Sequence, residues 1–213
     1  MGLAETQRLL AHLYTDARVR EQFFTQPAAL AAQLSLSPAP LPQAGTLPRD
    51  EITRFAKSLQ AKRLADTTKL LPLTRRALGR QFPLRFRAWT ETTPLLSPRR
   101  HSDDALRFSD HLLHPAGSAP PAPLPNWIAD LIRYESAALR AARPGRRLIM
   151  LRLRFTLADL QRCARSPRHR AKLRPGFSLF LWFRLTPHGP LRTFQFPFPD
   201  HRPALAPRSR RPT

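Results

Sequence analysis

The chain has 213 residues, enough for one large domain or two small ones, and its 42% of hydrophobic residues argues against wholesale disorder. Its formal net charge of +22 favours an anionic partner: nucleic acid, an acidic protein face or an anionic membrane surface. Only four of the 36 basic residues are lysine, and GC-rich coding also produces such an Ala-, Leu-, Pro- and Arg-rich composition, so the total charge has two explanations.

The single cysteine, Cys163, forms no disulfide within the chain, which fits a reducing compartment. The first 20 residues lack the apolar core and small-residue cleavage site of a secretory signal. No stretch reaches the ~18 apolar residues of a membrane span. We therefore expect a cytoplasmic protein.

Residues 1–113 are expected to form a helical domain. Thr15 or Asp16 stands where a second helix needs a capping side chain. A long helix is predicted from near Pro48 up to Pro72, which is itself well placed to begin the next helix.

Residues 55–79 carry Lys and Arg among apolar residues at helical spacing, and Pro72 divides them into two halves. Such a stretch suits either a structural helical hairpin or a DNA-reading helix-turn-helix. The basic residues do not follow one stripe, and the second half begins PLTRR without an obvious base-reading set. These observations favour the hairpin.

HPAGSAPPAPLP (114–125) is the clearest linker, because it is rich in proline. Residues 126–199 are expected to form a smaller domain, with an amphipathic helix capped by Asn126 and then three strands of an antiparallel sheet. The strand-like runs are RRLIMLRLRF, FSLFLWFRL and LRTFQFPF. Pro197 and Pro199 restrict the last run to a sheet edge, or mark its end. Residues 200–213 are predicted to form a basic tail. The order of the predicted elements, helices first and then a sheet, indicates an α+β fold.

The sequence shows no complete catalytic motif. His111, His114 and Asp110 lie together near a helix end but lack a further metal ligand. Cys163 has cationic neighbours such as Arg162, which lower a thiol pKa, but no His–Asp companion can be assigned. We expect a protein without enzymatic activity, metal or cofactor of its own.

Binding is better supported than catalysis. QRCARSPRHRAKLR (161–174) holds six Arg or Lys, one His and no acid, which suits phosphate binding or a solvated loop between two strands. The outer face of the first strand, with any open sheet edge, can instead accept an extended acidic peptide. The candidate peptide- or anion-binding residues are Arg152, Arg154, Arg162, Arg165, Arg168, Arg170, Lys172, Arg174, Trp182 and Arg184.

The stretches LYTDARVREQFFTQPAALAAQLSL, ITRFAKSLQAKRLADTTKLLPLTRRALGRQFPLRFRAW and WIADLIRYESAALRA resemble a group of small bacterial proteins. These are partner proteins of multinuclear non-haem iron oxidative enzymes, which modify cysteines in ribosomally made precursor peptides. RRLIMLRLRF and FSLFLWFRL are similar to that group's closing sheet. Some members of the group carry a DNA-binding label.

The resemblance implies a helical N-terminal domain and a C-terminal module that presents the precursor peptide to the enzyme. Peptide-recognition modules in such systems are usually winged-helix-like, with three strands followed by three helices. This chain instead predicts a helix and three strands with a basic insertion, so no peptide-contacting residue carries over from the group.

The functional expectation is a non-catalytic adaptor that binds an iron-dependent peptide-modifying enzyme and its precursor peptide. The alternative is a DNA-binding regulatory protein that uses the basic C-terminal half. A third reading is a regulatory subunit of an unrelated enzyme.

Overall fold

The computed structural model describes residues 3–35, 48–91, 93, 101–115, 123–173, 176–186 and 189–198. The fold is α+β as predicted, with helices first and a three-stranded antiparallel sheet near the C-terminus. Most of the predicted linker and the whole predicted tail lie outside the described residues. Among those residues, no helix combines the length and apolar character that a bilayer span needs.

The N-terminal helices are α1 (Leu3–Thr15), α2 (Ala17–Thr25) and α3 (Pro27–Gln33). Asp16 caps α2, because its carboxylate accepts hydrogen bonds from the backbone N–H groups of Arg18 and Val19 at 2.8 and 3.2 Å. Thr15 is instead the last residue of α1. The capping position is therefore confirmed at Asp16.

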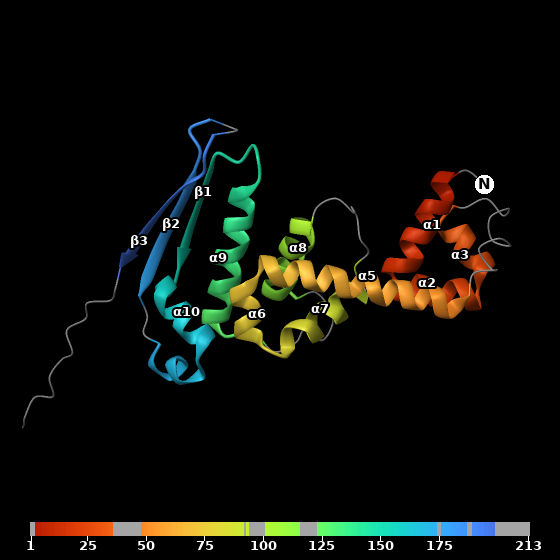
Figure 1. The fold of residues 1–213 in the computed structure, drawn as a ribbon, viewed down its shortest axis with the longest axis horizontal. Helices are drawn as coiled ribbons and strands as arrows, with labels where there is room; N and C mark the ends of the chain where they lie inside the picture. Colours follow the sequence, from red (N-terminus) through yellow and green to blue (C-terminus); the bar gives the residue numbers. More distant parts are fainter. Residues whose placement is uncertain are drawn as a thin grey trace, which may run out of the picture.

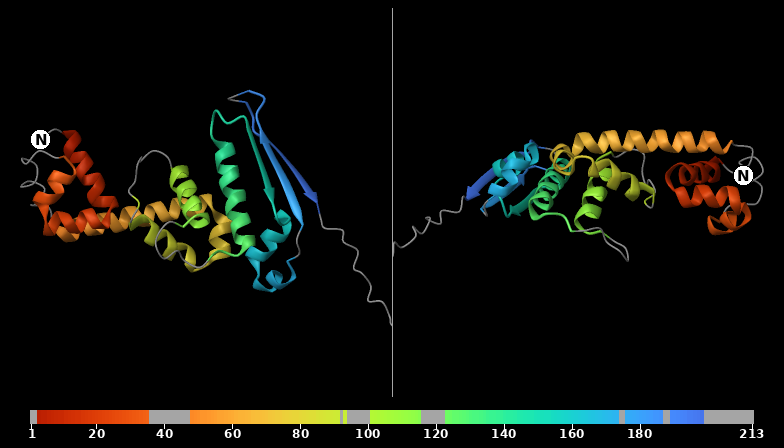
Figure 2. Two further views of the ribbon diagram at one scale, coloured as in Figure 1. Left: turned by 180° about the vertical axis from the view of Figure 1, so that it is seen from behind. Right: turned by 90° about the horizontal axis from the view of Figure 1, so that it is seen from below.

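The long helix α5 (Arg49–Leu70) is followed along the chain by α6 (Pro72–Leu78), α7 (Gln81–Glu91) and α8 (His101–Leu113). Pro72 begins α6 as predicted. Figures 1 and 2 show α5 running from the N-terminal helices to the part of the molecule that carries the sheet.

The C-terminal elements are α9 (Asn126–Ala142), β1 (Leu148–Leu153), α10 (Leu157–Arg165), the 3-10 helix η1 (Pro167–Lys172), β2 (Phe177–Phe183) and β3 (Arg192–Phe198). Asn126 is the first residue of α9, and Pro125 takes the capping position predicted for it. The strand order is β1-β2-β3, and both neighbouring pairs are antiparallel. Pro197 lies in the edge strand β3, as expected.

The apolar core divides along α5. One cluster joins α1–α3 to the start of α5, where Leu13, Leu30 and Ile52 are buried. The other joins α6–α8 to α9, β1, α10 and β2, and includes Phe108 and Leu131. This second core holds residues from both sides of residue 113, so α6–α8 share buried apolar contacts with α9 and the sheet.

Buried polar contacts fix the helices of this second core. Arg63 of α5 makes two hydrogen bonds to the Asp104 carboxylate of α8, at 2.7 and 3.0 Å, and both residues are buried. Part of the charge in the 55–79 stretch therefore holds helices together.

A second polar contact from a buried side chain fixes the start of α6 against α9. Glu135 of α9 accepts hydrogen bonds from the backbone N–H groups of Leu73 and Thr74 at 2.7 and 2.9 Å. A DNA-recognition helix needs an exposed N-terminal turn, so this contact favours the structural reading of the hairpin.

Candidate peptide- and anion-binding surfaces

The helix α9 covers one face of the sheet. Phe180 and Trp182 of β2 lie on this inner face, with ring centroids 5.0 and 6.0 Å from that of Tyr134 on α9. Both side chains are nearly inaccessible to solvent, at 1% and 4% exposed. The candidate binding residue Trp182 therefore belongs to the core and is not available to a ligand on the sheet surface.

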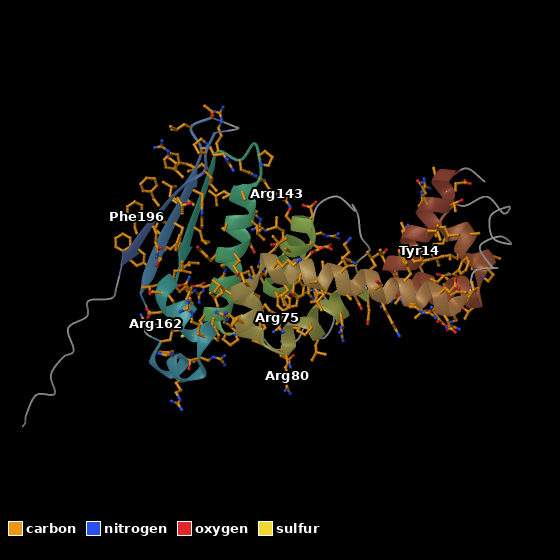
Figure 3. The ribbon with its side chains drawn as sticks, viewed as in Figure 1. Tyr14, Arg75, Arg80, Arg143, Arg162 and Phe196 are labelled. Carbon is orange, nitrogen blue, oxygen red and sulfur yellow. The ribbon has the colours of Figure 1, made fainter. Side chains whose placement is uncertain are left out.

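The opposite face, called here the outer sheet face, is left uncovered by the part of the chain that the structure describes. Residues opposite one another in neighbouring strands share a face, so the register defines its members. They are Leu148, Met150 and Arg152 of β1, Phe177, Leu179, Leu181 and Phe183 of β2, and Arg192, Phe194, Phe196 and Phe198 of β3. Figure 3 shows Phe196 and neighbouring rings projecting from the sheet on the side away from α9.

Large apolar side chains on this face are exposed to solvent. Met150 is 69% exposed and Phe196 is 45% exposed. Rings stack across the strands, with centroid separations of 4.3 Å for Phe177–Phe198 and 5.7 Å for Phe183–Phe194. A contiguous apolar face of this kind, left open, is typical of an interaction surface.

The charge on the outer sheet face is of one sign. Arg152 lies over the Phe177 ring, 4.9 Å from its centroid, and Arg192 is exposed at the start of β3. The three strands contain no Asp or Glu. The face therefore offers aromatic rings together with arginines that can pair with carboxylates.

The edge strand β3 is open as well. It pairs with β2 on one side, and no other strand in the described part of the chain pairs with its free side. Thr193 and Gln195, which point to the opposite face from Phe194, are also exposed. The helical layer thus does not reach β3, and an added strand could pair with its free edge.

The basic segment 161–174, for which a solvated loop was one of the two interpretations, is largely helical in the described residues. Residues 157–165 form α10, and Thr156 caps it by accepting a hydrogen bond from the Asp159 N–H at 3.2 Å. The 3-10 helix η1 follows at once. The pattern Thr-x-x-Asp at 156–159 is close to a capping box and could have revealed this helix in the sequence.

Several candidate arginines have structural partners. Arg162 pairs with Asp159 at 2.7 Å, and Arg170 lies over the Trp127 ring, 5.1 Å from its centroid. Arg184 donates to the carbonyl oxygens of Gly189, Ala141 and Ala142, at 2.6, 3.4 and 3.3 Å, so it ties the end of β2 to the end of α9.

Other candidates remain exposed. The Arg154 side chain faces solvent, while its backbone N–H donates to the buried carboxylate of Asp130 at 2.6 Å. Arg165 and Arg168 are exposed on α10 and η1. The side chain of Lys172 and the whole of Arg174 lie outside what the structure describes.

The residues considered for catalysis do not converge. Asp110 pairs with Arg140, and the His111 ring lies against Trp89, where burial and then the charge of Arg85 lower its pKa. In the described part of the chain, no three or more His, Cys, Asp or Glu side chains gather as metal ligands would.

Cys163 is buried in the second core. Burial raises the pKa of its thiol, and Asp159 adds to this effect, which outweighs Arg170 and Arg162. The shift is opposite to the one that the neighbouring arginines suggested, so the group stays a neutral thiol at physiological pH.

Comparison with known proteins gives no further assignment: no protein-family model matches the chain, and no curated protein matches it.

Proposed function

We propose that this protein is a non-catalytic adaptor that binds an acidic precursor peptide at its sheet and holds it for a metal-dependent peptide-modifying enzyme. The observation that carries the proposal is the outer sheet face, an open row of aromatic side chains next to arginines and without a carboxylate. The identity of the enzyme as an iron enzyme rests on the resemblance noted in the sequence.

The chemistry of the sheet defines the peptide. A segment added along the free edge of β3 gains main-chain hydrogen bonds, and alternate side chains then fall beside Phe194, Phe196 and Phe198. Apolar side chains of the peptide would pack on these rings. Acidic side chains would pair with Arg192, which lies on β3 beside the free edge. Arg152 lies on β1 at the other edge of the sheet, and the two arginines together disfavour a second copy of the same basic face.

The adaptor acts by positioning. A bound peptide is held near the enzyme's reaction centre, which raises its effective concentration there without any reactive group from the adaptor. Its contribution is therefore binding energy and orientation.

The test is the recovery of tagged protein from its native cytosol after nuclease digestion and a moderate-salt wash. We expect a stoichiometric iron-containing protein and a short acidic peptide, identified by metal analysis and mass spectrometry. Phe196→Glu should lower peptide recovery roughly tenfold or more, because it removes an aromatic contact and adds a repelling charge.

Leu84→Glu is the matched control, since Leu84 is 56% exposed on α7, outside the sheet. This variant should retain the peptide. If Phe196→Glu retains as much peptide as Leu84→Glu, the sheet is not the peptide site. If no iron-containing protein co-purifies with the unaltered chain, the adaptor assignment is wrong.

A further inference from the structure

Two basic segments that lie far apart in the sequence are neighbours in the fold. The helix α6 packs against α10, and Ala77 shares a core with Leu160 and Cys163. Figure 3 shows Arg75, Arg80 and Arg162 in this part of the molecule. The surface defined by α6, α10, η1 and the residue Arg80 is called here the α6–α10 surface.

The charge of this surface is unbalanced. Residues 67–90, which include α6, contain no Asp or Glu, and neither do residues 160–198, which include most of α10 and all of η1. Asp159 is the one acid of α10, and it already pairs with Arg162. Two acid-free segments therefore meet, and their positive potentials add.

Four arginines of this surface are exposed: Arg76 and Arg80 from the α6 side, Arg165 and Arg168 from the α10 side. Within the described residues, none of the four has an ion pair. Arg63 and Arg143, by contrast, are paired with aspartates. The four guanidinium groups are thus available to an external anion.

The composition of the surface selects the class of anion. None of the exposed large hydrophobic side chains in the described part of the chain belongs to α6, α10 or η1. A protein partner usually needs a desolvated apolar centre, and single-stranded nucleic acid needs aromatic rings on which bases stack. Duplex nucleic acid needs neither, because phosphate neutralisation and counterion release supply its affinity.

We infer that the α6–α10 surface binds the phosphate backbone of duplex nucleic acid without reading its sequence. Contacts to phosphate position a protein on the duplex but carry no sequence information. This site is separate from the outer sheet face and does not rest on the proposed adaptor function.

The experiment uses the full chain, freed of nucleic acid, and a short random-sequence DNA duplex, with binding followed by fluorescence anisotropy. With four phosphates neutralised, log K should fall with log salt at a slope of about −3.6, or roughly a hundredfold in affinity between about 50 and 200 mM salt. Duplexes of different sequence should bind alike, and a single strand should bind more weakly.

Two double variants divide the surface. Arg76→Ser with Arg80→Ser removes the α6 half, and Arg165→Ser with Arg168→Ser removes the α10 half. Each should reduce the slope by about 2, and both halves should matter equally. The matched control is Arg8→Ser with Arg18→Ser, which removes two exposed arginines from α1 and α2 and should leave the slope nearly unchanged.

Three results would overturn the inference: no duplex binding at low salt, an equal loss of affinity in the control, or tighter single-strand binding that Phe196→Glu abolishes. Loss of a co-purifying acidic protein in the double variants, with no duplex binding, would assign the surface to that protein. Peptide recovery should also be measured in the two double arginine variants. These variants should keep the peptide, so failure of the duplex-binding inference can be distinguished from failure of the adaptor proposal.

Discussion

The two faces of the C-terminal sheet are built from the same strands but have different surroundings. On β1, Ile149 and Leu153 face the core under α9, whereas Leu148 and Met150 face solvent. The two faces are similarly apolar, and arginine occurs on the outer one. Apolar character alone therefore does not tell which face of a sheet is covered within the chain and which is left for a partner.

The difference has an energetic meaning. A fully buried aromatic or aliphatic side chain of the inner face contributes about 1.5–3 kcal/mol to folding. The half-exposed rings of the outer face contribute less in the free protein, because they remain partly in water. Their remaining apolar area is available to stabilise a complex.

The largest expected effect comes from the inner face. Phe180→Ala should lower the free energy of unfolding by about 3–5 kcal/mol, because the ring is 1% exposed and packs against Tyr134 and Trp182. Urea unfolding measures this loss. A loss no greater than that of Phe196→Ala would show that the two faces are equally packed.

The next largest expected loss of stability comes from Asp130, whose carboxylate holds the backbone just after the end of β1. Asp130 is 1% exposed, accepts from the Arg154 backbone N–H and pairs with Arg133 at 2.9 Å. Asp130→Ala should cost about 2–3 kcal/mol, because two charge-assisted hydrogen bonds are lost. Hydrogen exchange should also quicken at the Arg154 amide, and unchanged protection there would contradict the proposed anchor.

A pH effect is expected on the covered side, at Glu135. Burial raises the pKa of Glu135 above its ordinary value of 4.5, although the hydrogen bonds from Thr74 and Leu73 oppose the shift. The folded state then binds more protons than the unfolded state just above pH 4.5. The Glu135 contribution to stability should fall as pH rises from 4.5 through the raised pKa.

Glu135→Gln should remove this slope from the stability profile measured by urea unfolding at a series of pH values. Above the raised pKa the variant should also be about 1 kcal/mol less stable, because the ionised carboxylate accepts from both Leu73 and Thr74, whereas an amide has one acceptor oxygen. An identical pH profile in both proteins would show that Glu135 titrates normally.

The smallest effect on stability is expected on the outer face. Phe196→Ser should change the free energy of unfolding by about 0.5 kcal/mol or less, because the ring is already 45% exposed. The same change should reduce self-association at high protein concentration, measured by light scattering. A large loss of stability would mean that this face packs against another part of the chain.

The candidate site was predictable only in part. Arg152 and the open edge of the sheet lie where the alternating pattern of β1 and the proline of β3 placed them. Trp182 is buried and does not lie on the predicted binding surface. The sequence could not show this, because β2 is apolar on both sides and carries no local sign of which side α9 covers. The charge of Arg184 suggests a binding residue, but in the fold its guanidinium group donates to the carbonyl oxygens of Ala141 and Ala142 at the end of α9.

The sequence by itself determined the α+β order, the Asp16 cap, the helix start at Pro72 and the alternation of β1, because these depend on neighbours within a few residues. It also contained the Thr156–Asp159 signal of α10, which the basic composition obscured. The tertiary structure alone decided which sheet face is open, that Arg63 meets Asp104, and that α6 lies beside α10. Those contacts join residues tens of positions apart, and they form because the apolar faces of several helices can be buried only together.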